Sequence, residues 1–563
     1  MVMMLAFGPV QPVNAKSSND FKRVKTTMYA FTMKQPLKPN LYFKGKGDIP
    51  YICLEEWEQL IPTLYSFEEP SYKITGKAKG KKYTLKRENG YTAVFDFEKN
   101  TLYFPDVDAF FHTSNSSLAS RETIGNNVAG LFSKTEESID RFGSDLKIDF
   151  KKYGIKIYAK GGLHFIPLQT YSDVFLSRGV SGYVVYNGKN IFLQAGSHIL
   201  ADDMMEEYLK APKRKMSKAF INFNYGELCL GLDYLYGLKE AHGIATFDRF
   251  FTETGLGFLL KTNKNNATYV DTALKNMINY YIDDGHTGYG GISYNSDYNG
   301  NKELYDKFMS MPKGPCEKHL DTTRDELLKS YNKAYPGGEK CYEEVGDTAF
   351  IKFDVFDFGN IEDYTSAPTE KEASEDTIRL IQYSRDKILR KNSPIKKVVL
   401  DLSINGGGYN SLAIYVIGFF LGEGNMAQMD VTTGAYSNAS YKVDTNRDGK
   451  FDSEDYLVGK GLDLYCFTSN FSFSCGNMVP CRFKDSGKVT LVGQTTGGGS
   501  CSVGYMSTAS GSTFQLSSPW RYSFTKNGSF YDVDRGADPD IYVKNLEKLY
   551  DRKYMVTFLD KVD

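Results

Sequence analysis

The stretch IKKVVLDLSINGGGYNSLAIYVIGFFLG (residues 395–422) limits the possible folds more than any other part of the chain. An apolar run of strand length is followed by a turn of three glycines and then by an apolar segment of helix length. A strand that is apolar on both faces is typical of a parallel sheet with helices on each side. The stretch therefore predicts an α/β fold in which a buried strand leads through a glycine turn into a helix.

The segments around this stretch extend the same pattern. Residues 347–358 (DTAFIKFDVFDF) alternate apolar and polar side chains, which indicates a strand. Residues 374–391 (SEDTIRLIQYSRDKILRK) indicate a helix that starts at Ser374 and ends in basic residues, as the helix dipole favours. In residues 468–483 (TSNFSFSCGNMVPCRF), a further strand passes into a helix close to Ser474.

The chain of 563 residues has room for several domains. Residues 19–115 and 116–200 repeat one plan, in which an apolar PYICL or HFIPL motif leads a short helix and then alternating strands. Leucines at helical spacing then indicate a helical domain over residues 201–290, and residues 291–563 are expected to form the α/β domain. We therefore predict a multidomain α/β protein with duplicated small α/β modules, a helical bundle and a β-sheet domain flanked by helices.

Composition narrows the classes of function. A formal net charge of -1 excludes a protein built to bind nucleic acid. No stretch reaches the roughly 18 apolar residues of a membrane span. Residues 1–18 are largely apolar and contain a small residue at Ala15, so they resemble the remnant of a secretory signal. We therefore expect a secreted protein or one associated with the cell envelope, which the N-terminal modules could contact.

Ser474 is suited to acyl-transfer chemistry. A serine hydroxyl is a weak nucleophile at neutral pH, so it needs an adjacent base, such as a histidine, and hydrogen-bond donors for the oxyanion. Ser474 lies where a strand ends and a helix begins, beside unpaired backbone N–H groups. The N–H of Cys475, with that of Gly407 or Gly408, is suited to hold the oxyanion because glycine lets the backbone approach a substrate closely. Ser472 would face the same side of the strand, so from the residues alone it stays an alternative nucleophile, as does the Cys475 thiol.

Five segments resemble, in order along the chain, pieces of the C-terminal processing (tail-specific) serine peptidases. They are DDGHTG (283–288), VVLDLSINGGG (398–408), NFSFSCGN (470–477), VGQTTGGGS (492–500) and DVDRGADPDIYV (532–543). The resemblance implies a ClpP/crotonase-like core, and its register favours Ser474 as the nucleophile. The Ser-Lys branch of that family has a lysine at the place of Gly499, whereas the branch like the core of tricorn protease uses a histidine from the helical part. The resemblance therefore implies His286 as the base.

The acid that would orient His286 has two candidates. The tricorn-like design uses a glutamate near the final Gly-x-x-Pro-Asp motif, and the resemblance leaves Asp534 as first choice there, with Asp532 second. Gly285 stands where that design has a serine before the histidine, so this relay residue is missing or is replaced by Thr287. The N-terminal repeats resemble the N-terminal-like modules of copper amine oxidases, without residues for copper chemistry.

A second motif interrupts the α/β domain. DTNRDGKFDSED (444–455) has oxygen side chains at positions 1, 3, 5, 9 and 12 and glycine at position 6, the spacing of an EF-hand or dockerin calcium loop. The ligand positions, including the backbone carbonyl expected at position 7, belong to Asp444, Asn446, Asp448, Lys450, Asp452 and Asp455. We predict a structural Ca²⁺ ion there, with a plain acidic turn as the alternative and no cofactor for catalysis.

Together these observations predict a serine endopeptidase that cleaves peptides or proteins through an acyl-enzyme on Ser474, with His286 as base. The alternative from another class is a catalytically decayed, peptidase-like binding protein of the cell envelope. The Gly285 change and the missing glutamate favour that alternative, and the retained serine, histidine and glycine turn oppose it. An esterase acting on small acyl groups is the third hypothesis.

Overall fold

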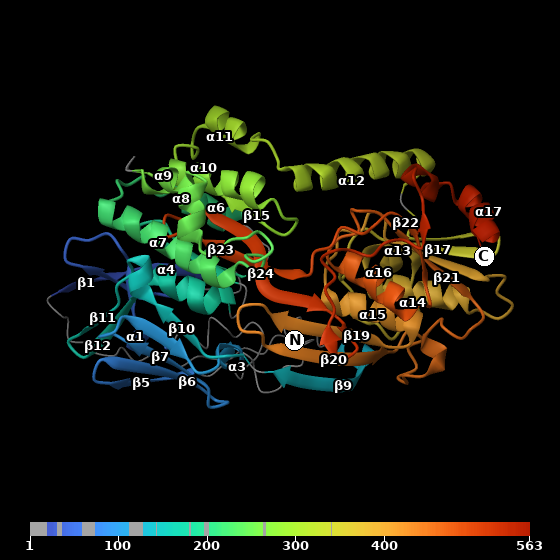
Figure 1. Ribbon diagram of the computed structural model, residues 1–563, viewed down its shortest axis with the longest axis horizontal. Coiled ribbons are helices and arrows are strands. Elements are labelled where there is room, and N and C mark those ends of the chain that lie inside the picture. The colour runs from blue at the N-terminus through green and yellow to red at the C-terminus, as the bar shows by residue number, and fades with distance from the viewer. Residues whose placement is uncertain are drawn as a thin grey trace.

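The computed structural model describes residues 20–30, 36–58, 74–111, 128–141, 143–178, 182–195, 202–262, 266–338 and 340–562. These residues form two lobes joined by a central sheet, and the long helix α12 (Pro315–Ala334) runs from one lobe to the other (Figure 1). The mixed α/β, multidomain architecture predicted from the sequence is confirmed. The predicted signal remnant, residues 1–18, lies outside the described residues. Among the described helices, none is both long and apolar enough to cross a bilayer.

The N-terminal lobe is built from sheets that mix strands of both repeated segments. β4 (Tyr51–Cys53) pairs with β12 (Leu163–Pro167), and β2 (Thr27–Ala30) pairs in parallel with β14 (Asn190–Ala195). The other strands of these sheets are β1 (Phe21–Lys25), β3 (Asn40–Lys44), β5 (Ile74–Lys79), β6 (Lys82–Arg87), β7 (Thr92–Asp96), β8 (Thr101–Phe104), β10 (Leu146–Asp149), β11 (Tyr158–Lys160) and β13 (Gly182–Tyr186). The two repeated segments therefore share sheets and one apolar core over their described residues.

A layer of helices lies beside this lobe. α7 (Lys218–Leu235) is capped by Ser217, whose hydroxyl accepts the backbone N–H of Phe220. The other helical elements of the layer are α6 (Asp202–Leu209), α8 (Phe247–Glu253), α9 (Leu256–Lys261), α10 (Thr268–Asn276) and the π-helical turn η5 (Met277–Ile282). Most of them pack around an apolar core that also takes in Phe514 and Leu516 from the central sheet. Helices are thus present where the leucine spacing predicted them, and η5 leads toward His286.

A central antiparallel sheet joins the two lobes. Its strands follow the order β15–β24–β19–β20–β9, and β23 also pairs with β24. Their bounds are β15 (Gly288–Gly291), β24 (Thr513–Ser523), β19 (Gly424–Asp430), β20 (Tyr436–Val443), β9 (Phe132–Arg141) and β23 (Cys501–Ser507). Because β15 closely follows His286 and pairs with β24, this sheet draws the histidine loop toward the C-terminal part of the chain.

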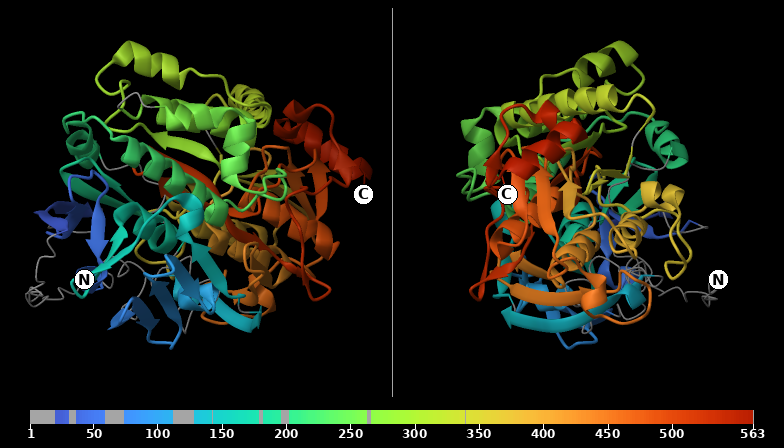
Figure 2. Two further views of the ribbon diagram at one scale, coloured as in Figure 1. Left: turned by 60° about the vertical axis from the view of Figure 1, so that its left-hand side comes forward. Right: turned by 90° about the vertical axis from the view of Figure 1, so that its right-hand side faces the viewer.

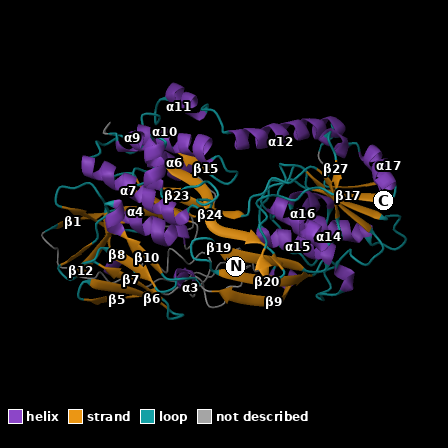
Figure 3. Ribbon diagram, viewed as in Figure 1, coloured by secondary structure: helices purple, strands orange, loops and turns teal. Residues whose placement is uncertain are grey.

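The C-terminal lobe contains the parallel sheet predicted from the glycine-turn stretch. Its strand order is β16–β17–β18–β21–β22–β27, and every neighbouring pair except β16–β17 is parallel. The strands are β16 (Tyr342–Val345), β17 (Thr348–Lys352), β18 (Lys397–Asp401), β21 (Asp463–Thr468), β22 (Thr490–Gly493) and β27 (Ile541–Tyr542). Helices cover both faces (Figure 3). The helices of one face are α14 (Thr377–Ile388), α15 (Asn410–Leu421) and α16 (Cys475–Ser486), and α17 (Arg552–Val562) lies on the other.

This topology gathers two loops at one edge of the sheet. β18 and β21 are parallel and paired, so their carboxyl ends lie side by side. The glycine turn leaves the end of β18, and the loop to Ser474 leaves the end of β21. In open α/β sheets, ligands bind beyond the carboxyl ends of the strands.

Both views of Figure 2 show the red helix α17 against this lobe, on the face away from α14, α15 and α16.

Shorter elements complete the described chain. Helix α14 starts at Thr377, later than the predicted Ser374, because Asp376 caps it by accepting the backbone N–H of Arg379 at 2.8 Å. The remaining elements are α1 (Leu54–Trp57), α3 (Val107–Phe111), η2 (Ala129–Leu131), η3 (Phe150–Tyr153), α4 (Leu168–Tyr171), η4 (Ser172–Ser177), α11 (Lys302–Met309), α13 (Glu370–Glu375), η6 (Ser453–Asp455), β25 (Thr525–Lys526), β26 (Ser529–Phe530) and η7 (Leu546–Tyr550). All eight cysteines are free thiols.

Candidate active site

Ser474 has the most unusual backbone conformation of the site. Its φ is 57° and its ψ is -123°, a combination that a side chain with a Cβ rarely adopts. The residue lies between the end of β21 and the start of α16, and it is held there by three backbone hydrogen bonds. Its N–H donates to the Gly498 carbonyl, and its own carbonyl accepts the N–H groups of Asn477 and Met478, each at 2.9 Å. Backbone strain of this kind clusters at functional sites.

The glycine turn approaches Ser474 closely. A Cβ on Gly407 would lie 2.5 Å from the Ser474 Cβ and 3.0 Å from its Oγ, and the φ of Gly407 is +106°. A side chain on Gly408 would collide with the backbone of Phe356. Both glycines are therefore required by space as well as by conformation, because a side chain at either would displace the turn from the serine.

The predicted oxyanion donors differ in what they already bind. The Gly407 N–H donates to Asn405 Oδ1 at 2.9 Å, whereas the Gly408 N–H has no acceptor among the described residues. Cys475 is the first residue of α16, and its buried thiol contacts the Gly408 carbonyl oxygen at 3.2 Å. Of the two glycines, Gly408 is thus the one with an N–H available to a substrate, and the Cys475 thiol is turned away into the protein.

Ser472, the alternative nucleophile, is fully enclosed. Its hydroxyl donates to the Leu402 carbonyl at 2.8 Å and accepts the N–H of Ser469 at 3.0 Å. Ser474, in contrast, is half-buried, and its hydroxyl makes no hydrogen bond within the part of the chain that the structure describes. A reactive hydroxyl must be reachable by a substrate, so the surroundings favour Ser474 of the two serines.

His286 lies in the loop between η5 and β15. Its carbonyl oxygen accepts the Nε2 of Gln515 on β24 at 3.1 Å, and the side chain is only 7% exposed. Burial lowers the pKa of His286 from its ordinary value, while the negative charges of Asp284 and Asp534 oppose that shift. The imidazole is therefore neutral at pH 7, as a general base must be.

Phe473 joins the histidine loop to Ser474, a contact that no motif or periodicity of the chain indicates. Its ring centroid is 4.7 Å from that of His286, with the two planes at 57°. The same ring fills the space that a Cβ on Gly285 or on Gly499 would need. His286 is thus brought against the residue next to Ser474, although no hydrogen bond between the imidazole and the Ser474 hydroxyl occurs among the described residues.

The two candidate acids differ in their relation to His286. Asp534 is half-buried and interacts electrostatically with the imidazole, and its Oδ1 accepts the Ser500 N–H at 2.6 Å. Arg521 pairs with both Asp534 and Asp532 at 2.5 Å. The Asp532 side chain is 54% exposed and accepts the N–H of Asp534 at 3.0 Å, so it supports the first acid rather than the histidine.

The hydroxyl of Thr287 does not replace the relay residue missing at Gly285. It donates to Asp284 Oδ2 at 2.7 Å and accepts the N–H of Ser517 at 3.2 Å. Both contacts lie within the loop and the adjacent strand, so this hydroxyl is occupied. Asp284, which accepts the hydrogen bond of the Thr287 hydroxyl, is a second residue that sequence reasoning missed. The DGHT motif places it two residues before the histidine.

The predicted calcium loop does not gather its carboxylates. Asp444 accepts the backbone N–H groups of Arg447 and Gly449, and Asp455 accepts those of Thr445 and Asp452. Among the described residues, no group of three or more His, Cys, Asp or Glu side chains is arranged to hold a metal ion. Ca²⁺ binding in this loop stays a prediction.

The remaining predicted ligands of this loop lie in the same state. Asn446 Oδ1 accepts the N–H of Asp448 at 2.8 Å, and Asp448 Oδ1 accepts that of Lys450 at 2.8 Å. Asp452 accepts the N–H of Glu454 at 2.8 Å as the cap of η6. These side chains stabilise turns of their own loop, so a bound ion would share their oxygens with backbone donors.

Comparison with known proteins bears on the C-terminal lobe. Residues 377–543 match the model of peptidase family S41. No curated protein sequence matches the chain. The 377–543 range contains the glycine turn, Ser474 and both candidate acids, and His286 lies outside it.

Several solved structures are distantly similar. The photosystem II D1 C-terminal processing protease is 17% identical with a TM-score of 0.24, and the match covers 35% of this chain and 42% of that one. A lipoprotein from Streptococcus agalactiae is 15% identical over 46% of this chain and 86% of that chain, with a TM-score of 0.26. Tricorn protease is 13% identical over 43% and 19%, with a TM-score of 0.22. Because these scores are low, none of these structures carries an argument, and the similarity that remains is that of residues 377–543 to the model of peptidase family S41.

Proposed function

We propose that this protein is a serine endopeptidase that cleaves peptides or proteins through an acyl-enzyme on Ser474. The observation that carries the proposal is the backbone of Ser474, held at a positive φ of 57° where a strand edge meets a helix N-terminus. A serine held on a sharp strand-to-helix turn presents its Oγ outward from the sheet, as nucleophilic serines of α/β hydrolases do. The family S41 match over residues 377–543 supports peptide bonds as the target.

His286 is the proposed general base. It is neutral at pH 7 because burial lowers its pKa, and its ring contacts the residue preceding Ser474. Catalytic hydrogen bonds are often long or absent before substrate binds and tighten in the complex. We therefore propose that a bound peptide closes the gap between the imidazole and the Ser474 hydroxyl, with Asp534 as the acid that favours the imidazolium formed during acylation.

The proposed oxyanion donors are the N–H groups of Gly408 and Cys475. Gly408 is favoured over Gly407 because the Gly407 N–H already donates to Asn405. Cys475 begins α16, so its N–H belongs to the positive end of a helix, where a developing oxyanion is stabilised. Removal of one donor of this kind typically costs about 3 kcal/mol of transition-state stabilisation.

The substrate is proposed to be an extended peptide, and the protein to act outside the cytoplasm or at the cell envelope. The apolar residues 1–18 are what supports this location. We propose that the N-terminal modules contact components of the envelope. No cofactor enters the proposed chemistry.

A fluorophosphonate probe tests the proposal, because only an activated serine reacts with it. We expect wild-type protein to be labelled on Ser474, S474A to lose the label, and the matched control S472A to keep it. H286A should lose at least about a hundred-fold in labelling rate, the usual contribution of a general base. Labelling that survives in S474A, or none in the wild type, would contradict the proposal.

One observation favours a second function, a peptidase-like binding protein. The Ser474 hydroxyl and the His286 ring are not hydrogen-bonded among the described residues, and Phe473 occupies space at Gly285 where the tricorn-like relay has a serine. A protein of this second kind would bind peptide without fluorophosphonate labelling. Peptide binding, measured by fluorescence polarisation, in a wild-type protein that fluorophosphonate does not label would support this second function.

A further inference from the structure

One carboxylate closes the loop that carries His286. Asp284 Oδ1 accepts the backbone N–H of His286 at 3.0 Å and that of Thr287 at 2.8 Å. Its Oδ2 accepts the Thr287 hydroxyl at 2.7 Å. Three donors of the same tight turn thus converge on one side chain, so the backbone of His286 is fixed by the Asp284 carboxylate.

The same carboxylate is anchored to two other elements. The Ser517 hydroxyl on β24 donates to Oδ1 at 2.8 Å, and the Tyr236 hydroxyl at the end of α7 donates to Oδ2 at 2.8 Å. Ser517 belongs to the central sheet and Tyr236 to the helical layer. Asp284 therefore fixes the histidine loop against both of the bodies that it lies between.

Asp284 also lies close enough to the imidazole to act on it electrostatically. Among the groups that raise the pKa of His286, it comes before Asp534. Asp534 shares Arg521 with Asp532, each at 2.5 Å, so its charge is partly offset. Within the described residues, the donors that reach the Asp284 carboxylate are all neutral, so its negative charge beside His286 has no cationic partner there.

We propose that Asp284 is the positioning residue of the catalytic histidine, which fixes the loop relative to Ser474 and, together with Asp534, favours the imidazolium during acylation. The proposal rests on the proposed serine-peptidase function. In this proposal, the Asp284 carboxylate orients His286, a task in which the tricorn-like design uses a serine at the place of Gly285. Asp284 touches neither substrate nor the reacting hydroxyl, so it acts through His286.

The test measures the rate of fluorophosphonate labelling of Ser474 between pH 4.5 and pH 8.5. In D284N, the amide keeps an oxygen for the backbone donors but loses the charge, so we expect the plateau rate to fall at least about ten-fold. We also expect the midpoint of the acid limb to move about 0.5 unit or more to lower pH, since a negative neighbour raises the pKa of histidine. D284E retains the charge and should keep the wild-type midpoint. The exposed carboxylate removed in D297N is the matched control, with neither change expected.

The outcomes separate the two proposals. Absence of labelling in the wild type would overturn the proposed function and this inference with it. Labelling of the wild type together with an unshifted midpoint and full plateau in D284N would overturn the role of Asp284 alone. If D284N does not fold, as judged by circular dichroism, Y236F and S517A decide: each frees one tie of the loop and should lower the plateau without moving the midpoint, and full plateaus in both would overturn the inference.

Discussion

At the scale of single residues, Phe473 accounts for the departures of this site from a Ser-Lys design. Its ring occupies the space beside Gly499, and the φ of Gly499 is +90°, where side chains are strained. A lysine at that position would meet both obstacles. The ring also excludes a side chain at Gly285. One aromatic residue next to Ser474 thus shapes both the histidine loop and the glycine loop.

Replacement of Phe473 by alanine tests this role. The substitution removes the ring that contacts His286 and leaves space beside both glycines. The position of His286 relative to Ser474 should therefore become less fixed. We expect the fluorophosphonate labelling rate to fall at least about ten-fold, equivalent to about 1.4 kcal/mol of barrier. F471A is the control, because Phe471 lies in the same loop and contacts Arg324 of α12 instead. Equal rates in F473A and F471A would show that the ring contact has no catalytic consequence.

At the scale of elements, α12 connects the histidine loop to the parallel sheet of the C-terminal lobe. Its first backbone N–H groups, those of Cys316 and Glu317, donate to Asp283 at 2.7 and 3.1 Å. Its other end packs through Leu327 and Tyr331 onto a cluster that includes Ile404 of the glycine turn. A helix fixed at both ends in this way holds the two halves of the site at a set separation, as its course in Figure 1 illustrates.

D283N tests the connection at the N-terminal end of α12. Asn keeps the left-handed backbone of Asp283, whose φ is 44°, but replaces one of the two acceptor oxygens and removes the charge at the start of the helix. We expect the free energy of unfolding in urea to fall by about 1 kcal/mol, the usual worth of a helix cap. Labelling of Ser474 should slow in parallel. D321N, on the exposed surface of the same helix, is the control, and a labelling rate in D283N equal to that control would disconnect α12 from the site.

The 444–455 loop tests a different hypothesis at this scale. Its carboxylates are satisfied by backbone donors, so an ion must compete with hydrogen bonds that already exist. We therefore predict weak Ca²⁺ binding, with a dissociation constant of about 0.1–1 mM as in extracellular calcium modules. Calcium at about 10 mM, roughly ten to a hundred times that constant, should raise the melting temperature of the wild type but not of D448N. D463N, outside the loop, should respond like the wild type, and an equal response in D448N would refute the site.

At the scale of the whole molecule, local patterns predicted elements and left their assembly open. The strand, glycine turn and helix of residues 395–422 are present as predicted. A strand buried on both faces has apolar side chains at consecutive positions, and a sequence shows such a run directly. The shared N-terminal sheets and the contact of Phe473 with His286 join segments far apart in the chain, and no periodicity encodes such pairs. The preference for Gly408 over Gly407 depends on one hydrogen bond to Asn405, which sequence cannot show.

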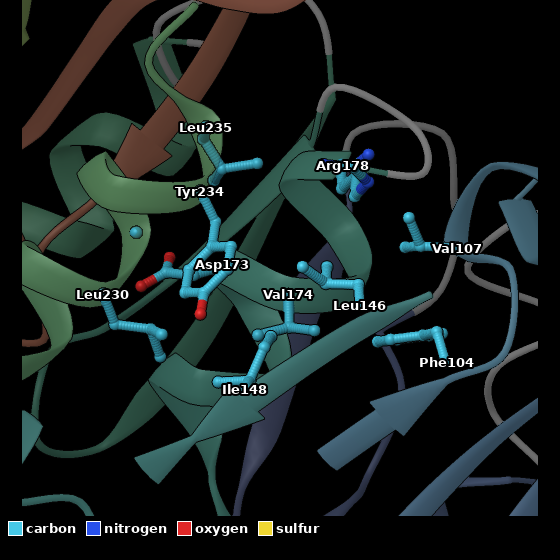
Figure 4. Close-up of a pocket in the computed structure, with 11 residues that line it drawn as sticks. Phe104, Val107, Leu146, Ile148, Asp173, Val174, Arg178, Leu230, Tyr234 and Leu235 are labelled. Carbon is cyan, nitrogen blue, oxygen red and sulfur yellow. The ribbon is translucent and has the colours of Figure 1, made fainter. Parts of the chain in front are cut away.

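Two buried carboxyl groups lie where the N-terminal lobe meets the helical layer. Asp173 on η4 faces a small cavity lined by Leu230, Tyr234 and other side chains (Figure 4), and Glu227 on α7 is also fully enclosed. Burial raises the pKa of Glu227 to about 8, and burial together with the neighbouring Glu227 raises that of Asp173. The nearest polar partners are neutral: Thr170 donates to Glu227, and Gln169 donates to Asp173 at 2.8 Å. Burial therefore favours the protonated form of both groups in the folded protein.

This pair predicts how stability depends on pH. Between the ordinary pKa of 4.5 and about 8, folded Glu227 keeps a proton that the unfolded chain releases, so stability falls as pH rises through that window. One such proton contributes a slope of up to about 1.4 kcal/mol per pH unit. E227Q should stabilise the protein at pH 8 and flatten this slope in urea unfolding measured from pH 5 to pH 8, whereas E253Q, at an exposed ion pair, should keep it. An E227Q slope equal to that of the wild type would contradict this prediction. It would mean that water reaches the contact between the N-terminal lobe and the helical layer, so that the pair ionises there with no loss of folding free energy.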